Sequence, residues 1–346
     1  MVTRQLLINH YKKYPALQIK DLFKFLYQST FGCEHLLCNE EKAIDYIKEE
    51  YIECGKVFIE ALDGDYTRVS LGFLDEGLTA ETFGRLFSLS AKEEKGSIDD
   101  LLKKLEILRE LIIENALPFT LEEFEKEIKE WEKEEFSPIH HSEEFRASYK
   151  PSYRLIHIKF IPFLPLFIEI DKRLKSGKLT LAIEGGSASG KSTLCKILSN
   201  IYDSAVFHID DFFLQEHQRT PERYKQIGGN LDRERFLSEV LIPLKNNDSI
   251  NYRRFDCGKM KILDGIEIRP KKLNIIEGAY SMHKELQEFY DLSIFLDIDK
   301  ESQRERILIR NPQLSSMFFD KWIPMEETYF KEWDIKNTCD MVINVK

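Results

Sequence analysis

Residues 185–192 restrict the possible folds of this chain more than any other stretch does. Their sequence, Gly-Gly-Ser-Ala-Ser-Gly-Lys-Ser, fits the phosphate-loop pattern G-x-x-x-x-G-K-[ST]. The apolar run 179–183 precedes it, and apolar residues at 194, 197 and 198 follow it at helical spacing. A strand, a glycine-rich turn and a helix in this order direct the first N–H groups of the helix, and the positive end of its dipole, at the loop. A glycine-rich turn can join any strand to any helix, but the agreement of all three parts predicts a site that cradles a polyphosphate.

The residue types in this loop suit different contacts with a polyphosphate. Glycine lets the backbone close around phosphate groups without a Cβ in the way. Lys191 can reach the β and γ phosphates as a point charge, and the Ser192 hydroxyl can ligate Mg²⁺. The predicted nucleotide-binding residues are Gly185, Gly186, Ser187, Ala188, Ser189, Gly190, Lys191, Ser192 and Thr193.

A chain of 346 residues is longer than a single hydrophobic core usually accommodates, so two domains are expected, at 1–175 and 176–346. The net charge of -10 offers no general attraction to nucleic acid or anionic membranes. The cysteines are scattered, and the first residues lack the apolar core of a signal peptide. The most apolar segment, 155–170, is too short and too polar to span a bilayer, so we expect a buried helix or a linker. These features favour a cytoplasmic protein that binds neither nucleic acid nor membranes, and they leave its oligomeric state open.

Residues 1 to about 135 show the apolar spacing of helices. Leu22, Phe23 and Leu26 form one short stripe, and a longer stripe runs over 98–112. Another helix is expected to begin at Thr120, whose hydroxyl can cap it while Glu123 reaches back. The residues of these last two helices expected to face inward are Ile98, Leu101, Leu102, Leu105, Leu108, Ile112, Leu121, Phe124, Ile128 and Trp131. We therefore predict a mainly α-helical N-terminal domain, whose role the sequence does not reveal.

Two polar clusters in the N-terminal half each admit a structural and a functional interpretation. Cys33, His35, Cys38 and Cys54 could bind zinc, but their spacing is not that of paired-cysteine sites, and we favour a packed His35. The second cluster could line a cleft facing the C-terminal half, or it could be a polar linker. It comprises His140, His141, Ser142, Glu143, Tyr149, Tyr153 and Arg154.

From about residue 176, short apolar strands alternate with helices, which is the pattern of a parallel sheet covered by helices on both faces. The predicted strands are 179–184, 205–209, 273–277, 292–297 and 340–344. Between the second and third strands we expect a helix with Phe236, Val240, Leu241 and Leu244 inward. A hairpin is expected around Asp264-Gly265, where a substrate flap could lie, because this dipeptide suits a tight turn with positive φ. The predicted fold class is thus α/β, with a helical N-terminal domain attached.

Ligands of such sheets bind at the carboxyl ends of the strands, and this sequence places acids there. Asp210 and Asp211 follow the second strand; a carboxylate there can accept a proton from an acceptor hydroxyl, hold Mg²⁺ through water, or simply cap a helix. Glu277 ends the third strand, where an acid can control a metal or an attacking group. Arg306 and Arg310, four residues apart on a later helix, can neutralise a transferring phosphate or form a solvated basic face.

Together these motifs resemble the uridine kinase and phosphoribulokinase group of P-loop kinases, over the C-terminal half of the chain. Besides the loop at 185–193, the resemblance rests on His208-Ile209-Asp210-Asp211-Phe212-Phe213 in the place of the family's Asp-x-Phe-Tyr, on Asn230-Leu231-Asp232, on Glu277-Gly278, on the arginine helix ending at Arg310-Asn311, and on the strand after Cys339-Asp340. It implies that Asp210 is the base that activates the acceptor hydroxyl and that Asp232 binds a substrate hydroxyl. It also implies phosphate and metal contacts for Lys191 and Ser192, and lid or transition-state charges for the two arginines.

The sequence departs from uridine kinases where those enzymes recognise the base. The histidine that follows their Tyr-Asp-Phe segment is absent after 252–257, and 311–317 lacks the arginines of the family's lid. Arg253 and Arg254 instead suggest an acceptor with a carboxylate or a phosphate group. The residues predicted to contact the substrate are Asp211, Asp232, Tyr252 and Arg254.

The sequence thus predicts an ATP- and Mg²⁺-dependent kinase acting on a hydroxyl of a small metabolite, with uridine as the nearest family precedent. The alternative is a nucleotide-driven regulatory module; against it, the guanine motif Asn-Lys-x-Asp is absent, and a switch needs neither the acid after the second strand nor a substrate hairpin. Neighbouring side chains of an extended chain point to opposite sides, so only one of Asp210 and Asp211 can face the γ-phosphate. We expect the base to be Asp210, which shares a side with His208.

Overall fold

The computed structural model describes residues 2–33, 39–51, 56–93 and 95–345. The chain divides into two compact units, Met1–Ile168 and Glu169–Lys346. This division falls inside helix α8 (Leu164–Ser176), a few residues before the boundary expected from the sequence. The segment 155–170, expected to be a buried helix or linker, is the end of a strand, a 3₁₀ turn and the start of α8.

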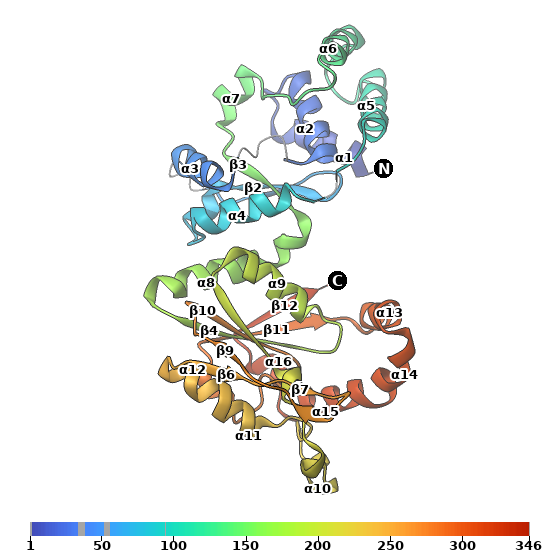
Figure 1. The fold of residues 1–346 in the computed structure, drawn as a ribbon. Helices are drawn as coiled ribbons and strands as arrows, with labels where there is room; N and C mark the ends of the chain where they lie inside the picture. Colours follow the sequence, from blue (N-terminus) through green and yellow to red (C-terminus); the bar gives the residue numbers. More distant parts are fainter. Residues whose placement is uncertain (1, 34–38, 52–55, 94, 346) are drawn as a thin grey trace. The chain divides into compact units, whose positions relative to one another are not determined.

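Helices predominate in the N-terminal unit, as the sequence predicts, and the described residues also contain a small antiparallel sheet that the sequence pattern does not predict (Figure 1). The helices are α1 (Val2–Lys13), α2 (Ile19–Phe31), α3 (Glu40–Glu50), α4 (Ala80–Ser90), α5 (Ile98–Ile113), α6 (Leu121–Lys133) and α7 (Glu143–Tyr149). The strands are β1 (Ile59–Ala61), β2 (Tyr66–Ser70) and β3 (Tyr153–His157). The central strand β2 pairs with β1 on one side and with β3 on the other.

The predicted helix faces are largely the buried faces. Leu22, Phe23 and Leu26 on α2 are fully buried. Thr120 caps α6 as expected, because its hydroxyl accepts from the Glu123 N–H while the Glu123 carboxylate accepts from the Thr120 N–H. The predicted inward orientation is wrong for three residues at or near helix starts, whose side chains are exposed: Ile98, Leu102 and Leu121.

The second polar cluster of the sequence belongs to a hydrogen-bonded network inside the N-terminal unit. The Asp21 carboxylate accepts from the Ser142 N–H and hydroxyl, and His141 Nδ1 lies 2.9 Å from Asp21 Oδ1. The other ring nitrogen of His141 lies 2.7 Å from the Tyr153 hydroxyl. Arg154 pairs with Glu50 instead of joining this network. These contacts satisfy buried polar groups, so they favour the structural interpretation of this cluster.

A fully buried arginine extends this network. Arg68 on β2 is 1% exposed and donates two hydrogen bonds to the Gln28 side chain, at 2.9 and 2.7 Å. It also donates to Glu60 at 2.9 Å, and its guanidinium lies 4.9 Å from the Tyr153 ring centre. A buried cation needs such partners, because an isolated charge is costly to remove from water.

The N-terminal unit is expected to lose stability as the pH falls from 7 to 4. Burial, above all, lowers the pKa of His141 to about 4 despite the opposing contact with Asp21, whereas an unfolded histidine titrates near about 6.5. The unfolded state therefore binds a proton over this window that the folded state does not, so stability present above pH ~6.5 is lost toward pH ~4. Calorimetry of the whole chain at several pH values tests this, and His141→Gln should reduce the slope. The matched control is His217→Gln at an exposed site of the other unit, and an unchanged slope in His141→Gln would contradict the assignment.

The C-terminal unit is built on a five-stranded sheet in the order β12-β11-β4-β10-β5, within the described residues. The strands are β4 (Leu179–Gly185), β5 (Ser204–His208), β10 (Leu273–Glu277), β11 (Leu292–Ile298) and β12 (Met341–Val345). All neighbours pair in parallel. The predicted strands are confirmed with ends shifted by at most one residue, as is the α/β fold class.

Helices cover both faces of this sheet (Figure 1). The helices of this unit after α8 are α9 (Lys191–Ile201), α10 (Pro221–Tyr224), α11 (Arg233–Phe236), α12 (Ile242–Asn246), α13 (Lys300–Arg310), α14 (Ser315–Met317), α15 (Ile323–Glu332) and α16 (Ile335–Thr338). A π-helical turn, Leu237–Leu241, joins α11 to α12, and the inward residues predicted for this segment are buried: Phe236, Val240, Leu241 and Leu244. These side chains share one core with Ala182, Phe207 and Ile276 of the sheet and with Tyr329 of α15.

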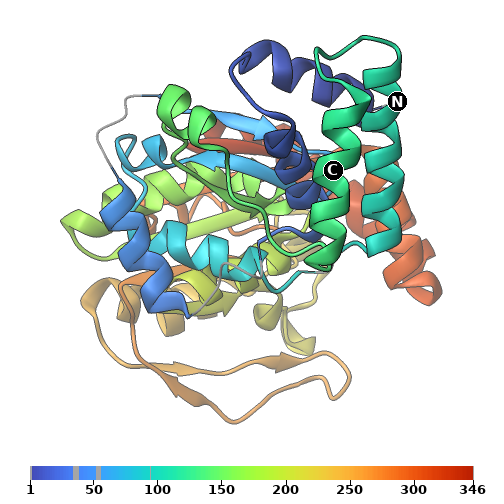
Figure 2. The same cartoon turned by 90° about the horizontal axis from the view of Figure 1, so that it is seen from above.

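The predicted hairpin is present, but its turn does not lie at Asp264-Gly265. The chain forms a long ribbon in which β6 (Ile250–Tyr252) pairs with β9 (Ile266–Ile268), and β7 (Phe255–Asp256) pairs with β8 (Lys261–Ile262). The ribbon, orange in Figure 2, projects from the unit and turns at 257–260. In this turn the Asp256 carboxylate accepts from the N–H groups of Gly258 and Lys259. Gly265 has no positive φ. Side-chain bonding at Asp256 therefore sets the turn, and Asp264-Gly265 only links two strand pairs.

Candidate active site

The phosphate loop has the backbone that its glycines predict. Gly185 and Gly190 have φ values of 147° and 98°, and Ala188 lies in the left-handed region at 61°. A Cβ at Gly185 would lie 2.7 Å from the Leu296 carbonyl oxygen, so this position has no room for a side chain. Helix α9 starts at Lys191 directly after the loop, as the sequence predicts. The first N–H groups of the helix therefore face the loop.

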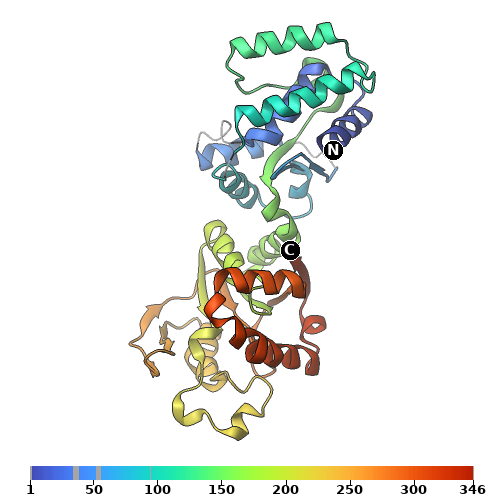
Figure 3. The same cartoon turned by 90° about the vertical axis from the view of Figure 1, so that its right-hand side faces the viewer.

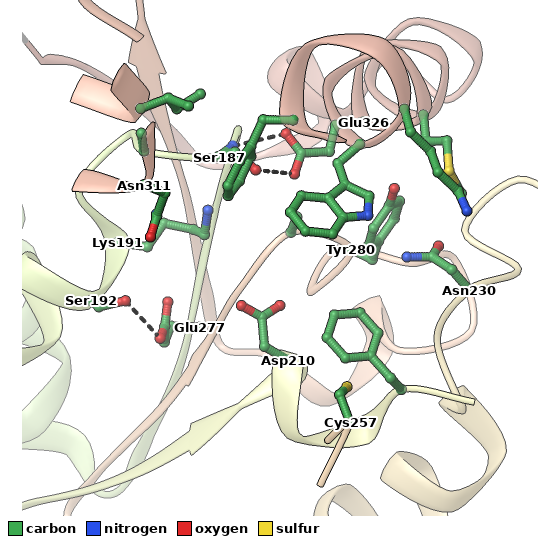
Figure 4. Close-up of a pocket in the computed structure, with 18 of the residues that line it drawn as sticks. Ser187, Lys191, Ser192, Asp210, Asn230, Cys257, Glu277, Tyr280, Asn311 and Glu326 are labelled. Atoms are coloured by element: carbon green, nitrogen blue, oxygen red, sulfur yellow. Dashed lines mark hydrogen bonds between the residues drawn. The ribbon is translucent and has the colours of Figure 1, made fainter. Parts of the chain in front are cut away.

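Lys191 folds back over the loop. Its Nζ donates to the carbonyl oxygens of Gly185 and Gly186, at 2.8 and 3.0 Å. The residue is only 9% exposed, because its side chain packs against the loop. Its ammonium group nevertheless lies on a pocket wall, where it can contact an anionic ligand (Figure 4).

Ser192 and Glu277 come together at the end of β10. The Ser192 hydroxyl donates to Glu277 Oε1 at 3.2 Å, and His208 Nδ1 lies 2.5 Å from the same oxygen. Burial alone would raise the pKa of Glu277, but the contact with His208 and the charge of Lys191 bring it below its usual value. Glu277 is therefore a carboxylate at neutral pH. Two oxygen donors side by side, one of them charged, suit a hard cation such as Mg²⁺.

Asp210 and Asp211 have different surroundings. Strand β5 ends at His208 and a 3₁₀ turn, Ile209–Phe212, follows, so the extended chain assumed from the sequence is absent here. Asp210 lines the pocket (Figure 4), whereas the Asp211 carboxylate accepts from the Tyr252 hydroxyl at 2.6 Å. Asp210 is exposed toward the pocket, but the surrounding protein atoms partly desolvate its carboxylate. This desolvation raises its pKa, with Glu277 acting in the same direction and Lys191 against.

Gly278 lets the backbone after Glu277 pass close to Asp210. Its φ is 142°, and a Cβ there would lie 2.9 Å from the Ile209 Cβ and 3.6 Å from Asp210 Oδ1. The acid on β10 and the acid after β5 therefore occupy adjoining walls of the pocket.

Arg306 and Arg310 both line the pocket, as their shared face predicts. Arg306 Nη1 also donates to the Ala188 carbonyl oxygen at 3.0 Å, and Gln303 of the same helix donates to the Ser187 carbonyl oxygen at 2.8 Å. Figure 3 shows α13 and α15, in orange and red, on the side of the unit that faces the viewer. Side chains of α13 thus hold the loop by donating hydrogen bonds to the carbonyl oxygens of the loop.

The pocket has a volume of about 590 Å³. Of the predicted residues, those that line it are Ser187, Ala188, Gly190, Lys191, Ser192, Thr193, Asp210, Glu277, Arg306 and Arg310. Its walls also contain Phe213 and Asn230, which belong to the motifs of the family resemblance. Residues that the sequence did not indicate line it as well: Tyr224, Tyr280, Phe318, Trp322, Met325 and Glu326. Gly185, Gly186 and Ser189 belong to the loop but do not line the pocket.

The structure does not bring the other predicted substrate contacts to this pocket. Asp232 is 2% exposed, caps α11 through the Arg235 N–H and pairs with the Arg235 side chain. The Tyr252 hydroxyl donates to Asp211, and Arg254 is exposed on the ribbon. Arg253 pairs with Glu239. Arg253 and Arg254 therefore do not support the expectation that the acceptor carries a carboxylate or a phosphate group.

The proposed zinc ligands cannot be compared as a group, because His35, Cys38 and Cys54 lie outside the described residues. Cys33 is fully buried, and its thiol lies 4.0 Å from the Phe87 carbonyl oxygen. Among the described residues, no group of three or more His, Cys, Asp or Glu side chains is arranged to hold a metal ion. None of the helices described combines the length and apolar content that a membrane span needs.

Several known proteins are similar in sequence to part of this chain. No family model matches the chain. The uridine kinase of Chlamydia pneumoniae is 28% identical over 171 residues, which cover 44% of this chain and 76% of the relative. That of Clostridium botulinum (strain Kyoto) is 29% identical over 143 residues, covering 38% of this chain and 68% of the relative. These similarities are consistent with a uridine kinase-like P-loop kinase domain over about half of the chain. The resemblance of the C-terminal half to this group, predicted from the motifs, is thus confirmed.

Solved structures are also similar to the kinase-like domain. One is described as a possible uridine kinase from Bacillus stearothermophilus, with 21% identity and a TM-score of 0.39, covering 52% of this chain and 99% of that one. Another is the shikimate kinase of Bacteroides thetaiotaomicron, with 12% identity and a TM-score of 0.26, covering 48% and 85% of the two chains.

Proposed function

We propose that the kinase-like domain transfers the γ-phosphate of ATP to a hydroxyl group of a small metabolite, and that it requires Mg²⁺. The observation that carries this proposal is the pocket in which the loop residues Lys191 and Ser192 lie with Asp210 and Arg306. Phosphoryl transfer depends mainly on positioning and on neutralising charge. This pocket offers cations for the phosphates and a carboxylate for the acceptor.

The oxygen donors of Ser192 and Glu277 would hold Mg²⁺ at the end of β10. Bound there, the ion neutralises phosphate charge. Glu277 can act directly or through water, since Mg²⁺ usually keeps several of its waters in proteins. His208 keeps the Glu277 carboxylate charged and fixes its orientation through the 2.5 Å contact.

Asp210 would accept the proton of the acceptor hydroxyl while that oxygen attacks the γ-phosphorus. The bond from the γ-phosphorus to the bridging oxygen breaks, and ADP leaves. Lys191 and the arginines of α13 counter the charge on the phosphate oxygens in this step. The elevated pKa of Asp210 makes this carboxylate a better proton acceptor than an ordinary aspartate.

The acceptor side of the pocket suits a molecule with a flat face. Aromatic side chains of Phe213, Tyr280 and Trp322 line it, and Asn230 adds an amide. Aromatic walls favour stacking with a ring. A nucleoside is therefore the first acceptor to test, and uridine leads because the relatives are uridine kinases.

A screen for acceptor-dependent ADP formation tests this function. The purified chain with Mg²⁺ and ATP is expected to release ADP rapidly only when a suitable nucleoside or other hydroxyl compound is added. ATP is expected to be a better donor than GTP. ADP release that no acceptor increases would indicate the alternative, a nucleotide-driven regulatory module, and equal specificity constants for ATP and GTP would contradict the donor preference.

A further inference from the structure

Glu326 places a carboxylate among groups that bind anions. It lies on α15, is 6% exposed, and lines the same pocket as Lys191. Its Oε2 accepts from the Ser187 backbone N–H at 2.8 Å, and its Oε1 accepts from the Ser187 hydroxyl at 2.6 Å (Figure 4). Both donors of Ser187 therefore point at one side chain. Hydrogen bonds to a charged acceptor are among the stronger ones in proteins.

The contact uses a donor that belongs to the phosphate loop. Backbone N–H groups of this loop are the donors that cradle phosphate oxygens, and Ser187 is its third residue. One N–H has a single hydrogen, so it cannot make a strong bond to Glu326 and to a phosphate oxygen at the same time. Phosphate and Glu326 also carry like charges, which repel at short range.

Three other side chains that hold the loop, those of Gln303, Arg306 and Lys191, do not compete in this way. Gln303 and Arg306 donate to the carbonyl oxygens of Ser187 and Ala188, and Lys191 donates to loop carbonyl oxygens as well. None of these contacts uses a loop N–H. Glu326 differs because it accepts where a phosphate oxygen would accept.

Helix α15 has a second attachment near the loop. Tyr329, one turn after Glu326, donates to the buried carboxyl group of Glu184 at 2.9 Å, and Glu184 also accepts from the Gly185 N–H. The Glu326 side chain can therefore leave Ser187 while α15 keeps its place. Burial, with Asp210 acting in the same direction, raises the pKa of Glu326, while Lys191 and the hydrogen bonds from Ser187 favour its carboxylate.

We propose that Glu326 is a built-in competitor for the phosphate loop, whose carboxylate holds Ser187 until a nucleotide phosphate displaces it. This inference rests on the proposed function, in that it requires the loop to bind ATP. Removing the competitor should strengthen nucleotide binding. A residue that merely supports the loop would have the opposite effect when removed.

The test is the dissociation constant of Mg-ATP for the full chain, measured by calorimetry. Glu326→Gln removes the charge and Glu326→Ala removes the whole acceptor. Both are expected to bind ATP more tightly, by about tenfold for alanine and somewhat less for glutamine. Ser187→Ala, which keeps the N–H but loses the hydroxyl, should show a smaller gain. Circular dichroism without nucleotide verifies that each variant is folded.

The neighbouring residue supplies the control. Glu327 pairs with Lys300 at 2.8 Å on the surface and does not line the pocket. Glu327→Gln should therefore bind ATP as the wild type does. Equal or weaker ATP binding by folded Glu326→Ala would overturn the inference and leave Glu326 as a support for the loop. If the wild-type chain itself binds no ATP, the proposed function falls together with this inference.

Discussion

Replacement of Asp210 by asparagine is expected to lower the turnover number by about 10²- to 10⁴-fold, the range for loss of a positioned general base. Asparagine has nearly the same shape but cannot take up the hydroxyl proton. The dissociation constant of ATP should change little, because the proposed role of this side chain is toward the acceptor. Turnover is measured with the acceptor found in the screen, and ATP binding is measured separately.

Asp211→Asn is the matched control. The Asp211 carboxylate accepts from the Tyr252 hydroxyl, and an asparagine oxygen can accept the same bond, so only a small loss of turnover is expected. The opposite ranking of the two variants would move the base to Asp211. A loss of ATP binding alone in Asp210→Asn would assign Asp210 to the metal instead.

The pH dependence of turnover adds an independent measurement on the same residue. A base works when it is deprotonated, so turnover should rise with pH through the pKa of Asp210. Desolvation raises this pKa above the ordinary aspartate value, and the rising limb should lie correspondingly higher. In Asp210→Asn, the residual turnover should rise less with pH, or not at all, over the same range.

Lys191→Ala is the second substitution with a large expected effect. Loss of one preorganised charge at a reacting phosphate typically costs about 10²- to 10³-fold in turnover, and ATP binding should weaken as well. The fold should persist, although two bonds to loop carbonyl oxygens are lost. Lys196→Ala on the exposed side of the same helix is the control. If Lys191→Ala kept the wild-type turnover, the assignment of this segment as a phosphate-binding loop would be wrong.

The parallel sheet was predictable because its signals are local. An apolar run bounded by polar residues marks each strand, and for β10 the predicted and observed limits are identical. The sheet of the N-terminal unit lacks such a signal. Its first strand has three residues, of which Ile59 is largely exposed, and its other edge, β3, comes from a distant part of the sequence. Pairing with β2, more than composition, defines these strands.

The pocket was predictable in its phosphate half and less so elsewhere. The loop, Asp210, Glu277 and the two arginines follow strand ends or share a helix face, which the sequence displays. Asp210 lines the pocket as expected, but a 3₁₀ turn replaces the assumed extended chain, so the argument that selected it was incorrect.

The remaining residues depend on tertiary packing. Glu326 meets Ser187 across 139 positions of sequence, and no local pattern announces such a contact. Asp232 shows the converse error, because an acid before a helix is also a cap, and here it serves as one. The turn does not lie at Asp264-Gly265 as expected, because the turn at Asp256 and the pairing of the strands set the register of the ribbon.

The close passage at Gly278 limits how this domain can diversify. A methyl group there would lie 2.9 Å from the Ile209 Cβ, so Ile209 would have to shift and would carry the adjoining Asp210, the proposed base, with it. Compensating changes would have to arise together on β10 and after β5, which single substitutions cannot achieve. The aromatic wall also includes Trp322, which lies in the turn before α15 and is remote in sequence from both acids. Selection for a new acceptor would therefore be expected to change that wall and to leave the acidic corner intact.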